Sequence, residues 1–371
     1  MIPDSLKQVR FRKIENVYKL FIWSILRYIQ LNNTRVYSEI YLSSEYPLEK
    51  LNIPKECIIK KEPSKKTLII APVFNLKILL RYFFMVKNLR ILDQDFFLTS
   101  AASTNFRLYF YDFISDNERK EYKDLSLKNI KKLKDSCEKL KQKQLLLLGT
   151  GPSFLKGKNY AIQNNIKTIT CNSAIYDQDI WKKINPILCF ADPVFHFGNS
   201  IEAKRFKNEV ISKFNESKFF IICPINAMPI LIKDWGIEKN YVIGLNFEKI
   251  SGHTNPLLGQ KLSVKRTSNV LTEFMLPIAS HLSKNILLAG FDGRKINDKN
   301  FWQYSKNTHQ PLHEHKAEHP SFFNDRNIER YYQKHLKTFE SQLIKLENVD
   351  YEIFNLTNSN IKFLNRRNID E

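Results

Sequence analysis

The stretch LLLLGTGPSF, residues 145–154, carries the strongest fold signal in this chain. Its four consecutive leucines predict a strand that is buried on both faces. The turn that follows is Gly149-Thr150-Gly151-Pro152-Ser153, in which two glycines let the backbone pass close to a ligand. A helix starting beyond the turn would favour a bound anion, although a plain strand-to-helix turn is the alternative. The turn matches neither the six-position dinucleotide fingerprint nor a Walker loop, so it indicates nucleotide chemistry without naming the nucleotide.

Further apolar runs of similar length follow this strand and alternate with helical stretches. They lie at residues 145–149, 167–172, 186–192, 218–224, 240–245 and 285–292. Runs without polar alternation are typical of parallel strands covered on both faces. Residues 144–371 are therefore predicted to form a doubly wound α/β domain with a mainly parallel, Rossmann-like sheet. A ligand of such a domain would bind at the carboxyl ends of the strands.

Residues 1–143 are predicted to be a separate N-terminal α/β or helical extension. They hold a strand at 66–72, apolar residues at helical spacing in 74–92, and a charged connector helix at 116–144. The whole chain of 371 residues has a formal charge of +20, and residues 1–143 contribute 28 Lys and Arg against 16 Asp and Glu. A basic surface attracts anionic lipid, acidic glycan or nucleic acid. Because no nucleic-acid motif is present, nucleic acid is not expected as a partner.

The cysteines and the N-terminus indicate the compartment. Five cysteines without CxxC spacing suggest neither a zinc site nor a disulfide framework, so a reducing cytoplasm is expected. The N-terminus lacks the order of a signal peptide. The apolar stretch 17–30 contains Lys19 and Arg27, and predicts a core helix or a helix lying on a membrane rather than one spanning it. We expect a cytoplasmic protein, with peripheral contact at the inner face of the membrane as an option.

Polar residues follow several of the predicted strands. Each group alone is also typical of helix caps and Asx turns, but the carboxyl ends of parallel strands meet at one crevice. The groups are Asn172 after the second strand, Asp192 after the third, Arg266, Thr267, Ser268 and Asn269 at a helix start, and Gly290, Asp292 and Arg294 after the last strand.

Residues 301–335 hold five of the eight histidines. No HExxH or comparable spacing appears, so no metal is expected and a mobile, histidine-rich lid is the preferred interpretation. A histidine that titrates near neutral pH could act as general base toward a sugar hydroxyl. Phe301, Trp302 and Tyr304 could wall a sugar or pack in a core.

The order of these motifs resembles the bacterial sialyltransferases that build lipooligosaccharide and capsule. The motifs are GTGPS, TCN, FADP, RTSN opening a helix, LLAGFDGR and a histidine-containing loop, over about residues 145–335. The wider group with a GxGPS loop includes the 6-hydroxymethylpterin diphosphokinase-like proteins. The resemblance implies a GT-A-like variant of the Rossmann-like fold, a mobile lid, a CMP-activated donor, no metal, no separate cofactor, and inversion at the anomeric centre.

The resemblance also implies roles for individual residues. Gly149 to Ser153 would approach phosphate and ribose, Asn172 would hold the cytidine-phosphate region, and Thr267 and Ser268 would contact phosphate or the donor carboxylate. Gly290 and Asp292 would line the nucleotide pocket, and His319, which precedes a predicted helix, would be the base. Three positions depart from the pattern. Thr150 and Asp192 stand where the family has asparagines. The family holds the leaving phosphate with a pair of tyrosines, whereas this chain offers only Tyr304, and Arg294 could supply charge instead of the second tyrosine.

These features predict an inverting, metal-independent glycosyltransferase. The donor would carry sialic acid or a related keto sugar such as Kdo, and the acceptor would be a surface polysaccharide or lipid-linked glycan. One alternative is a diphosphokinase-like enzyme in which Asp192 and Asp292 hold Mg²⁺. Another is a non-catalytic nucleotide- or glycan-binding protein. Self-association into a homo-oligomer is also open.

Overall fold

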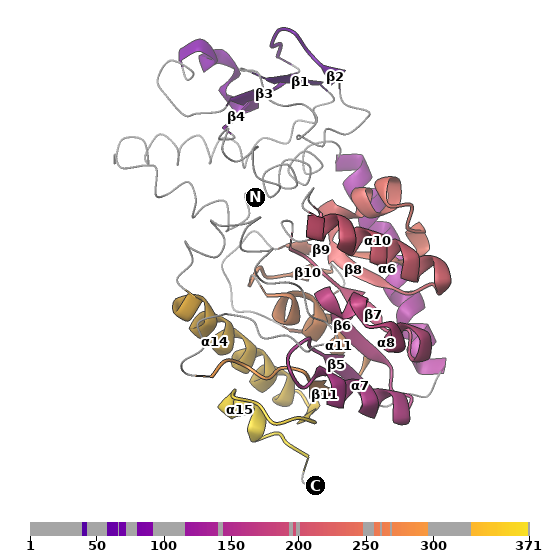
Figure 1. Cartoon of the computed structure of the whole chain (residues 1–371). Coiled ribbons are helices and arrows are strands. Elements are labelled where there is room, and N and C mark those ends of the chain that lie inside the picture. The colour runs from indigo at the N-terminus through magenta and orange to yellow at the C-terminus, as the bar shows by residue number, and fades with distance from the viewer. Residues whose placement is uncertain are drawn as a thin grey trace. The chain divides into compact units, whose positions relative to one another are not determined.

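The computed structural model describes 39–42, 58–65, 67–71, 80–91, 116–139, 144–192, 196–197, 201–247, 256–259, 262–267, 269–295 and 328–369. The chain divides into two compact units (Figure 1). The smaller unit comprises residues 1–120, 192–204 and 312–326, and the larger one comprises 121–191, 205–311 and 327–371. The domain limits 1–143 and 144–371 stay a prediction.

The larger unit is built on a parallel sheet. Among the described residues its eight strands lie side by side in the order β10 (Ser263–Val264), β9 (Val242–Phe247), β8 (Ile221–Pro224), β7 (Ile187–Cys189), β6 (Thr168–Cys171), β5 (Gln144–Leu148), β11 (Asn285–Ala289) and β12 (Glu352–Asn355). All neighbouring pairs are parallel. The predicted α/β class with a parallel sheet is confirmed, and all six predicted strands are present. The short β10 and β12 have no long apolar run and were not predicted.

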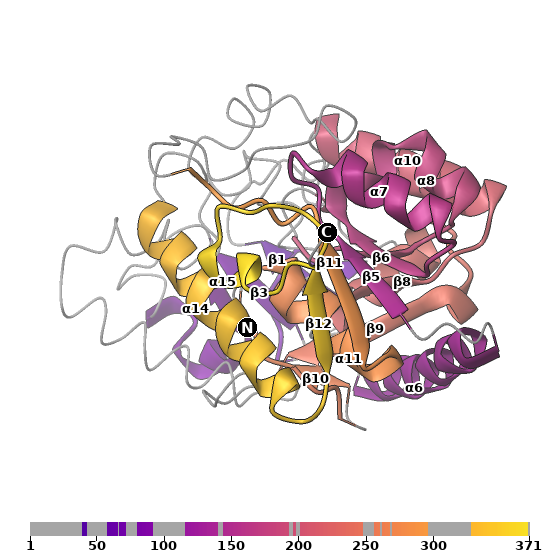
Figure 2. The same ribbon diagram turned by 90° about the horizontal axis from the view of Figure 1, so that it is seen from below.

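Helices cover both faces of this sheet (Figure 2). Successive residues of a strand point to opposite faces. Thus Leu145 and Leu147 share a core with helices α6, α11 and α14, while Leu146 and Leu148 are fully buried on the other face, where α7 packs. The helices are α6 (Asp116–Lys139), α7 (Phe154–Gln163), α8 (Gln178–Lys183), α10 (Ile201–Glu216), α11 (Leu276–Leu282), α14 (Ile328–Glu347) and α15 (Lys362–Asn365). Short 3-10 turns are η3 (Asn172–Tyr176), η4 (Ile225–Ala227) and η6 (Lys239–Tyr241), and π-helical turns are η5 (Ile230–Asp234) and η7 (Leu271–Met275).

The strand order reverses between β5 and β11. From β5 the chain runs outward through β6, β7, β8 and β9 to β10, and then returns to place β11 on the other side of β5. Because crossovers between parallel strands are right-handed, the helices of the two halves lie on opposite faces. At such a switch point the loops after the two strands diverge and leave a crevice at their carboxyl ends.

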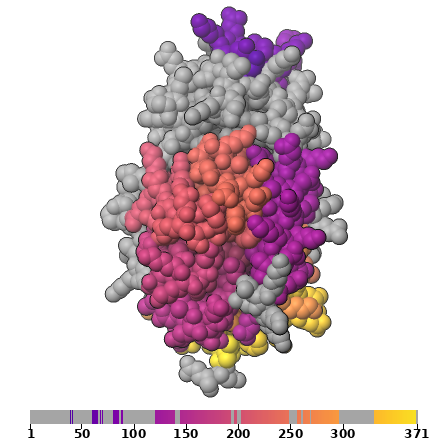
Figure 3. All heavy atoms as spheres, turned by 90° about the vertical axis from the view of Figure 1, so that its right-hand side faces the viewer, coloured from indigo at the N-terminus to yellow at the C-terminus, as the bar shows by residue number. Residues whose placement is uncertain are grey.

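The helix predicted as a connector, α6, belongs to the core of the larger unit from Glu121 onward. Ile130, Leu133 and Cys137 are buried, and the Asn129 side-chain amide donates to the carbonyl oxygens of Lys239 at 2.7 Å and Val242 at 2.8 Å. Figure 3 shows the purple atoms of α6 beside the orange and coral atoms of later segments. The sparse apolar stripe is sufficient because the helix buries only one narrow face.

The smaller unit contains a second parallel sheet. Its order is β2 (Ile58–Ile59), β1 (Glu39–Leu42), β3 (Thr67–Ala71) and β4 (Leu89–Ile91). The predicted strand at 66–72 is confirmed as β3. In the described part of 74–92, Leu80 and Arg81 are helical as expected, but the 3-10 turn η2 (Phe83–Asn88) and β4 follow in place of a continued helix. Asn88 ends this turn by donating from its side-chain amide to the carbonyl oxygens of Lys65 and Thr67, and the next residues pair with β3.

Some predicted features lie outside the described residues. These include the stretch 17–30 and the lid at 301–335 up to residue 327, so Tyr304 and His319 have no described position. From Ile328 onward the lid segment is the start of α14. No helix in the described ranges combines the length and apolar character needed to cross a membrane.

Candidate functional site

A cavity of about 160 Å³ lies at the carboxyl ends of β5, β6 and β11, at the switch point of the sheet. A volume near 150 Å³ holds a group the size of one aromatic ring, whereas pockets for whole drug-sized ligands span about 300–1,000 Å³. The described cavity therefore suits a group about the size of one ring. Its lining includes the predicted residues Gly149, Thr150, Gly151, Pro152, Asn172, Asn269, Gly290 and Asp292.

The glycines in the loops after β5 and β11 are required by the approach of these loops to each other. The Gly149 N–H donates to the Ala289 carbonyl at 2.8 Å, and the Gly151 N–H donates to the Gly290 carbonyl at 3.0 Å. A Cβ at Gly149 would lie 2.5 Å from the Gly290 carbonyl oxygen, and Gly290 has a φ of +76°. The freedom of these glycines was predicted to serve a ligand, but the structure uses it to join two strand ends.

Asp292 reaches across the switch point to the beginning of α7. Its two carboxylate oxygens accept from the Ser153 backbone N–H at 3.2 and 3.1 Å. The Ser153 hydroxyl makes no capping bond and donates to Thr357 at 3.1 Å instead. The helix terminus expected to favour a phosphate thus already faces a carboxylate. Thr357 lies after β12, and no sequence pattern marked it as a residue of the site.

The second predicted phosphate-binding site is the helix start at residues 266–269. Its backbone N–H groups also donate to side chains of the protein itself. The Asn269 side-chain oxygen accepts from the Leu271 N–H at 2.9 Å, so Asn269 caps the helix rather than Thr267. The Thr267 N–H donates to the Glu273 carboxylate at 2.5 Å, and the guanidinium of Arg266 lies 4.4 Å from the ring centroid of Phe247. Ser268 is outside the described residues.

The helix that follows is continuous through a proline. Pro277 has no N–H for the carbonyl of Glu273, and its ring crowds that carbonyl. The first turns widen into the π-helical η7 directly before α11, which accommodates the proline near the start of α11. The helix predicted to open at residues 266–269 is therefore present from about residue 270, with a widened start beside the cavity.

Asn172 occupies the mouth of β6 in a left-handed conformation, with a φ of +48°. Its side-chain Oδ1 is shielded from water and has no hydrogen-bond partner among the described residues. Beside it, burial raises the pKa of the Cys171 thiol to about 12, so this thiol stays protonated and unreactive. Asn172 is thus a predicted residue of the cavity lining with an unsatisfied polar atom.

One wall of the cavity comes from α14 and was not predicted from the sequence. Tyr332, His335 and Phe339 lie three and four residues apart, so they share one helix face. The imidazole of His335 stacks on Phe339 with ring centroids 6.0 Å apart and 13° between the planes. Burial lowers the pKa of His335 to about 4, so the imidazole is neutral at physiological pH. The helical spacing was the signal that could have identified these residues.

Because folded His335 resists protonation, we expect the protein to lose stability in mild acid. A histidine in the unfolded chain takes up a proton near its ordinary pKa of 6.5, whereas folded His335 does so near 4, so stability falls as the pH decreases between these values. The full loss is about 3 kcal/mol. Urea unfolding at several pH values should show that His335→Leu lacks this part of the loss. Equal acid losses in both proteins would contradict the prediction.

Two other predicted residues lie apart from the cavity lining. The backbone N–H of Arg294 donates to the Tyr332 hydroxyl at 2.9 Å, and its guanidinium pairs with Glu329 at 3.2 Å. Asp192 is half-buried beyond the end of β7 and belongs to the smaller unit. Within the described ranges no three His, Cys, Asp or Glu side chains gather in a geometry able to hold a metal ion.

No protein-family model, curated protein or solved structure matches this chain.

Proposed function

We propose that this protein is a glycosyltransferase that uses a CMP-activated sugar and builds a surface polysaccharide or lipid-linked glycan. One observation carries the proposal. Residues from three separate segments that the motif order assigns to the donor, Gly149–Pro152, Asn172 and Gly290 with Asp292, line one cavity at the switch point of a parallel sheet. Open α/β sheets bind nucleotides at this point. The finer description of the domain as a Rossmann-like, GT-A-like variant is part of the same proposal.

In the proposed reaction the cavity holds the nucleoside end of the donor. His319 takes the proton of the acceptor hydroxyl, whose oxygen attacks the anomeric carbon as the bond to the CMP phosphate breaks. Attack from the opposite side inverts the anomeric centre. Arg294 and Tyr304 offset the charge on the departing phosphate. The donor is sialic acid or a related keto sugar, and no metal is needed for this step.

The smaller unit is proposed to meet the membrane that carries the acceptor. Leu80, Phe83 and Phe84 are exposed by 65%, 59% and 96%, and Arg81 lies among them. Apolar side chains flanked by a positive charge favour an anionic lipid surface. Together with the charge of +20, this supports a peripheral protein on the inner face of the cytoplasmic membrane.

The proposal predicts that CMP stabilises the protein and that transfer proceeds in EDTA. A ligand present at 100 times its Kd, bound only by the folded state, adds about 2.7 kcal/mol to the free energy of unfolding. Melting curves with CMP, CDP, UDP and ATP, followed by transfer assays with CMP-activated keto sugars, test this. Stabilisation by ATP with Mg²⁺ alone would overturn the proposal in favour of a diphosphokinase-like enzyme. Stabilisation by CMP without turnover of any CMP-activated sugar would favour a binding protein.

A further inference from the structure

Two polar atoms of the cavity walls lack partners. They are Asn172 Oδ1, at the end of β6, and His335 Nδ1, on α14. Each is shielded from water and has no hydrogen bond within the part of the chain that the structure describes. Leaving a buried polar atom unpaired costs about 1–3 kcal/mol. Both atoms belong to residues that line the cavity, and each sits in a terminal group that turns about a single torsion.

The charge of the cavity selects the kind of ligand. Of the described lining residues only Asp292 carries a charge, and that charge is negative. The two helix starts nearby bind Asp292, Asn269 and Glu273 instead of an external anion. A phosphate inside the cavity would meet a carboxylate without a compensating cation on these walls. The cavity therefore suits an uncharged, hydrogen-bonding group about the size of one ring.

His335 is held as a neutral recognition group. Its ring lies parallel to that of Phe339, which fixes the plane of the imidazole, and burial disfavours the charged form. A neutral imidazole offers one donor and one acceptor, as an amide does. Because its pKa is far below 7, it is poorly suited to act as the general base, which is consistent with a separate base such as His319.

We propose that His335 is a specificity-determining residue that hydrogen-bonds the uncharged nucleoside part of the ligand, opposite Asn172. That the nucleoside is cytidine rests on the proposed function; that the group is uncharged and ring-sized rests on the cavity. In this proposal His335 contacts the nucleoside and not the phosphate. Its replacement should therefore weaken the binding of cytidine and the binding of CMP by the same factor.

Two substitutions separate hydrogen bonding from packing. His335→Leu and His335→Asn both remove the imidazole ring, but asparagine keeps a polar atom close to the position of Nδ1. In the 371-residue chain we expect His335→Leu to weaken the affinity for cytidine and CMP at least tenfold, which is about 1.4 kcal/mol. The affinity of His335→Asn should stay within about threefold of the wild type. His335→Leu should also melt at a higher temperature than His335→Asn, because it has no polar atom left to satisfy.

The matched control is Asn285→Thr. Asn285 Oδ1 is likewise buried and unpartnered within the described structure, but it lies at the start of β11, at the opposite end of that strand from the cavity. This variant should bind cytidine as the wild type does. Calorimetric titration with cytidine, uridine, adenosine and CMP measures all variants.

The outcomes distinguish the two proposals. Equal affinities of His335→Leu and His335→Asn, or a loss for CMP but not for cytidine, would overturn the role of His335, as would a wild type that binds none of these nucleosides. If the wild type binds adenosine or uridine instead of cytidine and His335→Leu weakens it, His335 keeps its role and only the CMP donor is overturned. Cytidine binding without sugar transfer would likewise count against the transferase alone.

Discussion

Replacing Gly290 by alanine should destabilise the larger unit by about 4 kcal/mol and abolish ligand binding in the cavity. Gly290 has a φ of +76°, and its new Cβ would lie 2.7 Å from the carbonyl carbon and 3.1 Å from the nitrogen of Gly149. Strain of a side chain in this conformation costs about 1–3 kcal/mol, and overpacking adds a similar amount. The neighbouring atoms are backbone atoms of the loop after β5, so they cannot move without displacing the cavity wall. Urea unfolding and cytidine titration measure the two effects.

Two other glycines separate these causes. Gly236 has a φ of +69°, but a Cβ added there would have no atom within 4 Å, and Gly259 has neither a positive φ nor a close neighbour. Gly236→Ala should therefore lose only about 1 kcal/mol from the backbone conformation, and Gly259→Ala should be close to neutral. If Gly290→Ala is no worse than Gly236→Ala, the close approach of the two loops does not determine the stability of the site.

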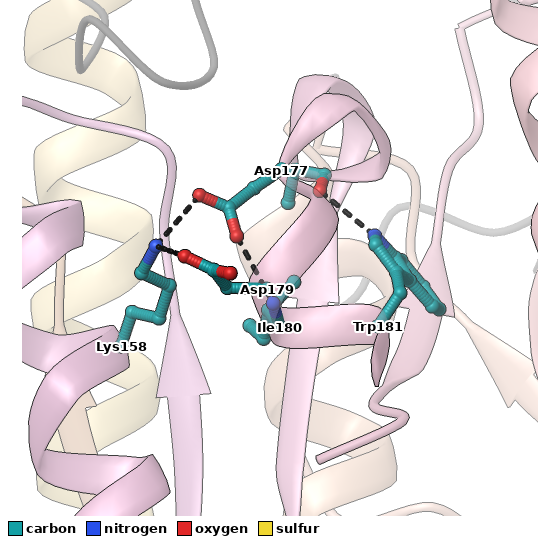
Figure 4. A network of polar contacts seen from close by, with 6 residues as sticks. Lys158, Asp177, Asp179, Ile180 and Trp181 are labelled. Carbon is teal, nitrogen blue, oxygen red and sulfur yellow. Dashed lines mark hydrogen bonds and ion pairs between the residues drawn. The ribbon is translucent and has the colours of Figure 1, made fainter. Parts of the chain in front are cut away.

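Removing the buried cation of Lys158 should cost about 3–5 kcal/mol of unfolding free energy. The ammonium of Lys158 on α7 lies 2.9 Å from Asp177 and 3.2 Å from Asp179, and the Lys158 and Asp177 side chains are each only 3% exposed (Figure 4). Asp177 also accepts from the Ile180 N–H at 3.0 Å at the start of α8. In Lys158→Met the buried carboxylate of Asp177 loses this cation, and removing one member of a buried ion pair is strongly destabilising. Urea unfolding of Lys158→Met measures the loss.

The controls lie on the same elements. Lys156→Met changes an exposed lysine of α7 and should cost less than about 0.5 kcal/mol. In the double variant Lys158→Met with Asp177→Asn, the amide keeps an oxygen for the Ile180 N–H without a buried charge, so part of the stability should return. A loss below about 1 kcal/mol for Lys158→Met would show that water or other groups already compensate Asp177. Because α7 follows the Gly149–Ser153 turn and Asp177 follows η3, this ion pair braces two walls of the cavity.

The strands and the turns at their ends were predictable because their signals are local. A run such as Leu145–Leu148 needs burial on both faces, and the glycines of 149–151 follow it directly. The position of Asn172, Gly290 and Asp292 near one another followed from parallel pairing, which brings strand ends to one edge. The helix expected at 74–92 is present at residues 80–81 but does not continue from Phe83 onward, because the helical spacing of apolar residues does not reveal that β3 offers a pairing partner to residues 89–91.

By itself the sequence determined the α/β class, the parallel strands and the edge of the sheet where the candidate site lies. Only the tertiary structure decided which groups remain available there. In the fold, Asp292 accepts a hydrogen bond at the start of α7. Asn269 and Glu273 bind the N–H groups of the predicted phosphate-binding helix start. His335 on α14 lines the same cavity as the turn after β5, which lies nearly two hundred positions earlier in the chain. The physical reason is that strand formation depends on neighbouring residues, whereas capping, burial and the pKa of a side chain depend on partners that are distant in the sequence.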